Sequence, residues 1–281
     1  MAERTFHFIT GLPRSGSTLL SAILSQNPRF HAGITSPVAS VVNAVIAQVS
    51  AGSEWGSLVN TEQRRAMLRG LFDSYYADCG QPVVFDTNRG WSARLPVVLD
   101  LFPQAKILAC VRNVGWVMDS LERLYRANPY ENTTLFATDA ERSTVYTRVD
   151  TLGQRTRLVG VAWAGLKEAF YSEQGASMMM IDYEILAQRP APVIDLVYGF
   201  LGEKAFPHDF DHIEFAAPNY DDGLGLAGLH TIRPSVSFQN RQSVLPPDLF
   251  EQYAKLSFWH NDAGSRCSVL RMGEPGSAQP L

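Results

Sequence analysis

The chain has 281 residues, of which 46% are hydrophobic and 19% are charged, and this composition excludes wholesale disorder. At roughly 150 residues per domain, the length allows one or two domains with a full core that needs no disulfides or metals. The formal net charge of -4 provides no basic excess that would favour a nucleic acid or an anionic membrane as partner.

The cysteines and the first residues indicate the compartment. Cys79, Cys110 and Cys267 are widely spaced and form no CxxC or Cys/His cluster, so we expect neither a disulfide framework nor a zinc site. The first four residues run directly into a strand-like segment without a signal-peptide pattern. No apolar run approaches the roughly 18 residues that a membrane span needs. We therefore expect a cytoplasmic protein without a membrane span.

Short apolar strands alternate with helices along the chain. The apolar patterns predict strands over residues 5–10, 82–86, 106–111 and 177–182. Helical periodicity and end signals predict helices over 17–26, 37–49, 61–77, 92–102, 116–125, 143–172 with breaks near Gly153 and Gly160, 192–201 and 247–258. Residues 203–245 are expected to be irregular.

This alternation indicates βαβ units and a parallel sheet that is covered on both faces, in one α/β domain. We place the domain at residues 1–262 and a flexible Gly/Ser/Pro tail at 263–281. Ligands of such sheets bind beyond the carboxyl ends of the strands. The rule points to the segments that follow Thr10, Phe85 and Val111.

The first of these segments has the pattern of a phosphate loop. A strand, then Gly11-Leu12-Pro13-Arg14-Ser15-Gly16-Ser17-Thr18, then a helix, would direct backbone N–H groups and a helix N-terminus at an anion. Ser17 replaces the lysine of a nucleotide hydrolase, whereas Arg14 adds a cation inside the loop. A Gly-rich turn without a ligand is the alternative.

The second anion motif is the end of the strand over 106–111 and the helix after it. Arg112 ends the strand and Ser120 lies about two turns into the helix, so the two side chains could hold one phosphate. The alternative is that Arg112 pairs with Asp86 or Asp119.

These motifs resemble the sulfotransferase family that uses 3′-phosphoadenosine-5′-phosphosulfate (PAPS), nearer to its bacterial, tyrosylprotein- and carbohydrate-type branches than to its cytosolic branch. The resemblance spans about residues 6–245 and implies a P-loop-type fold with a central parallel sheet flanked by helices. It rests on these segments, in family order: Gly11–Leu20 as the 5′-phosphosulfate loop, Val111–Asn113 with Ser120 as the 3′-phosphate motif, Asp182–Leu186 with Pro190, and Ile232–Pro234 with Arg241.

The resemblance also implies how the donor is held, with no metal. Arg14 and the loop amides would hold the 5′-phosphate leaving group, and Arg112 with Ser120 the 3′-phosphate. The implied donor-binding residues are Arg14, Ser15, Gly16, Ser17, Thr18, Arg112, Ser120, Tyr183, Arg233 and Arg241.

The catalytic group is where the sequence departs from the family. Thr35 stands where the protein-tyrosine branch has a catalytic glutamate, and no histidine follows the strand over 82–86. The lysine that many members have near here is absent, with Thr87 or Arg89 in its place, and Arg89 is our candidate for its role at the bridging oxygen. Asp86, at a strand end, is the first candidate for the base. A structural pair of Asp86 with Arg89 or Arg112, a base at His31 or His230, and no base at all remain open alternatives.

We thus expect an enzyme that moves a sulfuryl group from PAPS to a hydroxyl, phenol or amine of a small-molecule, carbohydrate or peptide acceptor. A P-loop kinase or nucleotide hydrolase, and an inactive nucleotide-binding protein, are the alternatives. The sequence leaves three questions open: which molecule is the acceptor, whether the chain forms a homodimer, and whether residues 127–142 form a lid.

Overall fold

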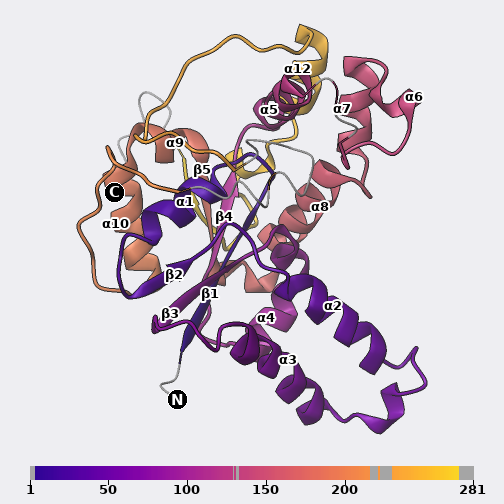
Figure 1. Cartoon of the computed structure of the whole chain (residues 1–281), viewed down its shortest axis with the longest axis vertical. Coiled ribbons are helices and arrows are strands. Elements are labelled where there is room, and N and C mark those ends of the chain that lie inside the picture. The colour runs from indigo at the N-terminus through magenta and orange to yellow at the C-terminus, as the bar shows by residue number, and fades with distance from the viewer. Residues whose placement is uncertain (1–3, 129, 131–132, 216–220, 222–229, 272–281) are drawn as a thin grey trace.

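The computed structural model describes residues 4–128, 130, 133–215, 221 and 230–271. They form one α/β domain around an all-parallel sheet with the strand order β2-β3-β1-β4-β5-β6 (Figure 1). The described strands are β1 (Thr5–Gly11), β2 (Phe30–Ala32), β3 (Val83–Thr87), β4 (Ile107–Val111), β5 (Met178–Asp182) and β6 (Ser268–Leu270).

Helices cover both faces of the sheet. One face packs on α2, α3, α4, α5, α7, α8 and α12, and the other on α1, α9 and α10 (Figure 1). The described α-helices are α1 (Ser17–Leu24), α2 (Val38–Val49), α3 (Thr61–Tyr75), α4 (Leu95–Leu101), α5 (Val114–Ala127), α6 (Asp139–Arg142), α7 (Val145–Gly153), α8 (Leu158–Tyr171), α9 (Tyr183–Gln188), α10 (Pro190–Leu201) and α12 (Pro247–Ala254). Among the described helices, none has the length and apolarity to cross a lipid bilayer.

The central strands are largely apolar because neither face meets water: β4 is apolar throughout, and β3 and β5 are apolar up to Asp86 and Asp182. Every residue of β3, β4 and β5 is buried. Within β1, Phe8 joins the core under α3 and α4, whereas its neighbour Ile9 joins the core under α1 and α10. This alternation decides which side chains at a strand end can reach a ligand.

The sheet order places a crevice at the end of β1. The chain passes from β1 to β2 and β3 on one side, then crosses to β4 on the other side of β1. The loop after β1 therefore lies where the strand order reverses, which is where ligands of open α/β sheets bind. The expected fold class, a parallel sheet flanked by helices, is confirmed.

Several elements differ from the sequence prediction. The strands β2 and β6 and the helix α9 were not expected, and β6 lies inside the segment predicted to be a flexible tail. Residues 268–270 are three consecutive residues that pair with β5, too short a run to stand out from a Gly/Ser/Pro-rich segment. The tail from 272 onward lies outside the described residues.

The predicted helix over 143–172 is two helices, α7 and α8, separated by residues 154–157. The second begins so close to the end of the first that a Cβ on Gly160 would lie 2.1 Å from the carbonyl oxygen of Gln154. The predicted helix over 92–102 is a 3₁₀ helix (Arg89–Arg94) followed by α4, and the last predicted helix ends at Ala254.

Candidate functional site

The loop between β1 and α1 depends on two glycines that cannot be replaced without strain. Gly11 has φ 141°, and a Cβ there would lie 2.1 Å from the carbonyl oxygen of Cys110. Gly16 has φ 93°, and its Cβ would lie 2.8 Å from the Tyr183 ring. The backbone of the loop thereby packs against β4 and α9, and the first turn of α1 faces the cavity with Ser17 and Thr18.

Inside this loop, Arg14 and Ser15 have opposite orientations. The Ser15 hydroxyl lies 2.7 Å from the carbonyl oxygen of Cys110 and 2.5 Å from that of Leu12, so this buried side chain secures the loop to β4. Arg14 has φ 60°, a conformation that costs a residue with a Cβ on the order of 1–3 kcal/mol. Its Nε donates a 3.1 Å hydrogen bond to the Ser120 Oγ on α5.

Arg112, directly after β4, carries the second cation of the site. Its guanidinium lies 4.6 Å above the ring of Tyr183, the first residue of α9. Burial is the main cause that lowers the pKa of Arg112. Its buried Nε donates a hydrogen bond to no described residue. The Arg112 side chain also lines the cavity, so its guanidinium is placed to meet an anionic ligand there.

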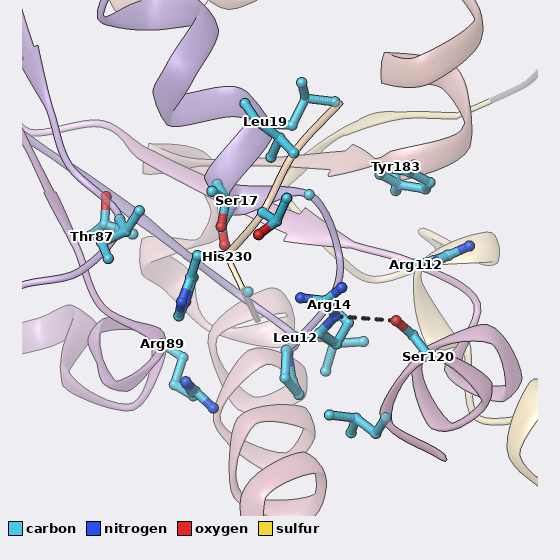
Figure 2. A pocket seen from close by; sticks show the side chains of 18 of the residues that line it. Leu12, Arg14, Ser17, Leu19, Thr87, Arg89, Arg112, Ser120, Tyr183 and His230 are labelled. Atoms are coloured by element: carbon cyan, nitrogen blue, oxygen red, sulfur yellow. Dashed lines mark hydrogen bonds between the residues drawn. The ribbon is translucent and has the colours of Figure 1, made fainter. Parts of the chain in front are cut away.

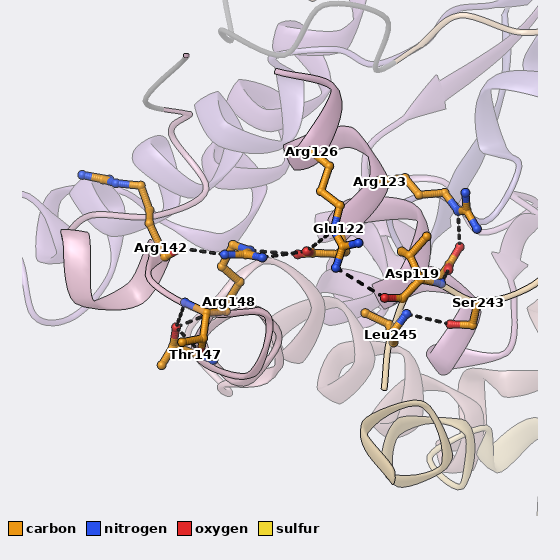
Figure 3. Close-up of polar contacts among 11 residues, drawn as sticks. Asp119, Glu122, Arg123, Arg126, Arg142, Thr147, Arg148, Ser243 and Leu245 are labelled. Atoms are coloured by element: carbon orange, nitrogen blue, oxygen red, sulfur yellow. Dashed lines mark hydrogen bonds and ion pairs between the residues drawn. The ribbon is translucent and has the colours of Figure 1, made fainter. Parts of the chain in front are cut away.

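The late basic segment, which carries Arg233 and Arg241, is held in place by Asp119 on α5 (Figure 3). This fully buried carboxylate accepts hydrogen bonds from Arg241 Nη2 at 2.7 Å, Arg123 Nε at 3.0 Å and the Val244 backbone N–H at 2.7 Å. Arg241 Nε, like that of Arg112, is buried and donates to no described residue. Asp119 thus forms ion pairs with Arg123 and Arg241. The alternative in which Asp119 pairs with Arg112 does not match these contacts.

These elements enclose one cavity of about 730 Å³ at the carboxyl ends of β1, β3 and β4 (Figure 2). Its described lining contains no Asp or Glu and six arginines: Arg14, Arg89, Arg112, Arg123, Arg233 and Arg241. Because the charged side chains of this lining are all positive, they create a positive potential in the cavity, which suits a ligand with several negative charges.

The structure brings most of the predicted site residues to this cavity. Those that line it are Arg14, Gly16, Ser17, Thr18, Arg89, Arg112, Ser120, Tyr183, Arg233 and Arg241. Ser15 and Asp86 lie outside the lining. Thr134 and Leu135, from the segment in which we considered a lid, also line the cavity, whereas residues 129, 131 and 132 of that segment lie outside the described residues.

Asp86 faces away from the cavity. Its carboxylate is fully buried under α2 and α3, where it accepts hydrogen bonds from Ser36 Oγ at 2.7 Å, Tyr76 OH at 2.8 Å and Trp91 Nε1 at 2.7 Å. Burial raises the pKa of the Asp86 carboxyl, and these three bonds favour its charged form. The next residue, Thr87, is the one that lines the cavity. Asp86 therefore has the position of a structural carboxylate, although its three donors are neutral groups and not Arg89 or Arg112, the partners considered in the alternative.

The two histidines considered as bases lie in different places. His31 lines a separate cavity of about 460 Å³ with Tyr75, Tyr76, Asp78, Cys79 and Gln81. His230 lines the main cavity, and its ring pairs with Asp221. Sequence reasoning missed Asp221 as a supporting residue and considered Asp119 only as a partner of Arg112, because nothing in their spacing shows which side chain they meet.

This arrangement defines a class of protein: a parallel α/β protein with a phosphate loop that lacks the hydrolase lysine and with a second basic site beside it. The model of the sulfotransferase family matches residues 7–207, which is more than half of the chain. The chain therefore belongs to the sulfotransferase family and is an enzyme of sulfuryl transfer. None of the comparisons favours the kinase alternative.

Solved structures share the fold at low sequence identity. Mouse sulfotransferase SULT7A1 complexed with PAP matches with a TM-score of 0.53 and 17% identity, over 94% of this chain and 88% of that one. The sulfotransferase domain of the Synechococcus PCC 7002 olefin synthase matches with a TM-score of 0.50 and 17% identity, over 91% and 95%. No curated protein matches the sequence.

Proposed function

We propose that this enzyme transfers the sulfuryl group of PAPS to a hydroxyl group of an acceptor, and that the cavity holds the donor. The observation that carries the proposal is the cavity lining beside the phosphate loop, which among the described residues has six arginines, Arg112 and Arg241 included, and no Asp or Glu. A donor with a 3′-phosphate and a 5′-phosphosulfate supplies two anionic groups. PAP bound to the mouse relative supports the same ligand class.

Each element then has a part in holding the donor. The backbone N–H groups from Ser15 to Thr18, at the N-terminus of α1, would bind the 5′-phosphate. Arg112 and Ser120 would bind the 3′-phosphate, beside the Tyr183 ring. Arg233 and Arg241, from the late segment, would cover the donor.

Arg89 and Arg14 are suited to the reacting end. Sulfuryl transfer is an in-line displacement in which negative charge builds on the leaving phosphate, so fixed cations there lower the barrier. The Arg89 side chain enters the cavity from the end of β3, and its own carbonyl oxygen accepts from Thr10 Oγ1 at 3.1 Å. Arg89 would therefore stand in the lysine's place at the bridging oxygen. The acceptor class, whether small molecule, carbohydrate or peptide, is not narrowed by these contacts.

Thermal unfolding with PAP, AMP and ATP tests the donor assignment. At a hundredfold excess over Kd, ligand linkage supplies about 2.7 kcal/mol. At about 2–4 °C per kcal/mol, PAP should raise the Tm by about 5–10 °C without magnesium, and AMP should raise it less. In Arg112→Ala the PAP and AMP shifts should converge, whereas Arg65→Ala, which removes an exposed arginine paired with Asp100, should leave both unchanged. Equal shifts in the unchanged protein, or a larger magnesium-dependent shift with ATP, would refute the proposal.

A further inference from the structure

His230 and Asp221 form a close side-chain pair at the cavity. The ring Nδ1 of His230 lies 2.5 Å from Asp221 Oδ1, and the His230 backbone N–H donates to Asp221 Oδ2 at 2.8 Å. The Asp221 side chain is 4% exposed and the His230 side chain 15% exposed. One carboxylate thus holds both the backbone and the ring of His230, which fixes the orientation of the imidazole.

The pairing also fixes which ring nitrogen can take up a proton. An ionised carboxylate only accepts hydrogen bonds, so Nδ1 of His230 carries the proton that is shared with Asp221. In the neutral ring the lone pair is then on Nε2. A histidine whose Nδ1–H is bonded to a carboxylate has the tautomer that a general base requires.

His230 lies toward the reacting end of the proposed donor. Figure 2 shows its ring on the side of the cavity with Ser17 and Arg89, with Arg112 and Ser120 on the opposite side beyond Arg14. If the 3′-phosphate binds at Arg112, the sulfuryl group lies toward Arg89 and the imidazole. The charge of Asp221 also acts on Arg14 and favours its protonated form.

The lining of the cavity leaves few other proton acceptors. Its described residues include no Asp, Glu, Lys or Cys, and the arginines are permanently charged. Imidazole is the side chain that accepts a proton near neutral pH. His31 lies in the separate cavity, and Asp86 is buried against Tyr76 and Trp91.

We propose that His230, oriented by Asp221, is the general base of the transfer, an inference that rests on the proposed function. Nε2 takes the proton of the acceptor hydroxyl while the acceptor oxygen forms its bond to sulfur. The bond between sulfur and the bridging oxygen breaks, and its electron pair goes to the 5′-phosphate of the departing PAP. The imidazolium then releases the proton to solvent. Asp221 is a positioning residue in this scheme.

The test measures PAP release from PAPS, with water alone or with phenols of increasing acidity as acceptor. His230→Gln should lower kcat about 10²–10⁴-fold with water and with weakly acidic phenols. The loss should shrink as the phenol becomes more acidic, because a phenolate attacks without a base. The Tm shift by PAP should stay as in the unchanged protein. Asp221→Asn should also lower kcat, since the amide can donate to Nδ1 and move the ring proton to Nε2.

A matched control is available on the surface. His212 pairs with Asp209 through Nδ1 at 2.9 Å, but its side chain is 81% exposed and lies outside the lining of the cavity. His212→Gln should keep full turnover. Added imidazole should restore part of the activity of His230→Ala, because free imidazole can occupy the space and accept the proton.

The outcomes separate the two proposals. Absence of stabilisation by PAP in the unchanged protein would refute the proposed function. Stabilisation by PAP together with full turnover by His230→Gln would refute only the assignment of His230 as the general base. A loss that is equal for all acceptors and is not rescued by imidazole would mean that His230 is structural. If the unchanged protein released no PAP at saturating PAPS, the assignment of His230 as the general base would also be overturned.

Discussion

Arg14 of the phosphate loop donates a 3.1 Å hydrogen bond through its Nε to the Ser120 Oγ, across 106 residues of sequence. The sequence suggested two separate anion sites, one at the loop and one at Arg112 with Ser120. The structure joins them. Burial lowers the pKa of the Arg14 guanidinium, and the nearby charge of Arg112 lowers it further. An anion between the two cations would relieve both effects, so the two sites should act as one.

We expect Arg14→Ala and Ser120→Ala to have non-additive effects on PAP binding. Loss of a charge-assisted hydrogen bond costs about 1.5–3 kcal/mol, so Arg14→Ala should raise the Kd roughly ten- to 150-fold. In the double variant the loss should differ from the sum of the single losses by about 0.5 kcal/mol or more, as is usual for residues in contact. Calorimetric titration of the four proteins with PAP measures this coupling. Strictly additive losses would show that the hydrogen bond does not link the two sites.

The fold was largely predictable because its central strands are mostly apolar and are separated by helices. β1, β3, β4 and β5 follow that rule, and their boundaries differ from the prediction by one residue. Two edge strands of three residues, β2 and β6, give too short a pattern to be distinguished from a loop. The break between α7 and α8 depends on the close approach of Gly160 to Gln154, a tertiary detail.

The candidate site was predictable where the chemistry is local in sequence, as in the phosphate loop and the Arg112–Ser120 motif. The sequence did not reveal the roles that depend on the direction in which a side chain points. Asp86 and Thr87 are neighbours at the end of β3, and the register of the sheet turns only Thr87 into the cavity. The pairing of Asp221 with His230 depends on a chain path that their spacing of nine residues does not reveal.

We predict that Asp86→Asn affects stability and not catalysis. The amide that replaces one carboxylate oxygen cannot accept from Ser36, Tyr76 and Trp91 as the carboxylate does. Leaving a buried donor unpaired costs about 1–3 kcal/mol, or several degrees in Tm. The kcat of the folded protein should stay within about twofold.

The control for Asp86 is Asp100→Asn, which removes an exposed partner of Arg65 and should cost about 0–1 kcal/mol. A hundredfold fall in the kcat of Asp86→Asn at an unchanged Tm would assign the base to Asp86 after all.

We expect Asp119→Asn to weaken donor binding through the late segment. Asp119 holds Arg241 and the Val244 backbone, so its loss should release Arg241 from the cavity. The Kd for PAP should rise about tenfold or more. Glu122→Gln is the matched control: Glu122 is equally buried on α5, but it binds Arg148 and Arg126 and so secures α7 (Figure 3). That variant should lose stability and keep its Kd; equal changes in Kd for both variants would contradict the anchoring role.

The last prediction concerns His7, which is buried in the strand β1. The residue is 2% exposed, and its Nδ1 accepts a 3.0 Å hydrogen bond from the Lys106 backbone N–H. Burial, and to a smaller extent the charge of Lys106, lower the pKa of His7 from 6.5 to about 4. The folded protein therefore keeps this ring neutral at a pH where the unfolded chain already binds a proton.

Because the unfolded state binds the extra proton, the contribution of His7 to stability is fully present above pH 6.5 and is lost as the pH falls to about 4. At about 1.36 kcal/mol for each pKa unit, the loss is about 3 kcal/mol. His7→Asn keeps an acceptor, Oδ1, for the Lys106 N–H but does not titrate. Urea unfolding of both proteins between pH 4 and 7.5 should show their free energies of unfolding converging, or crossing, toward acid pH and running parallel above pH 6.5. Parallel curves over the whole range would show that His7 is protonated in the folded protein as readily as in the unfolded chain.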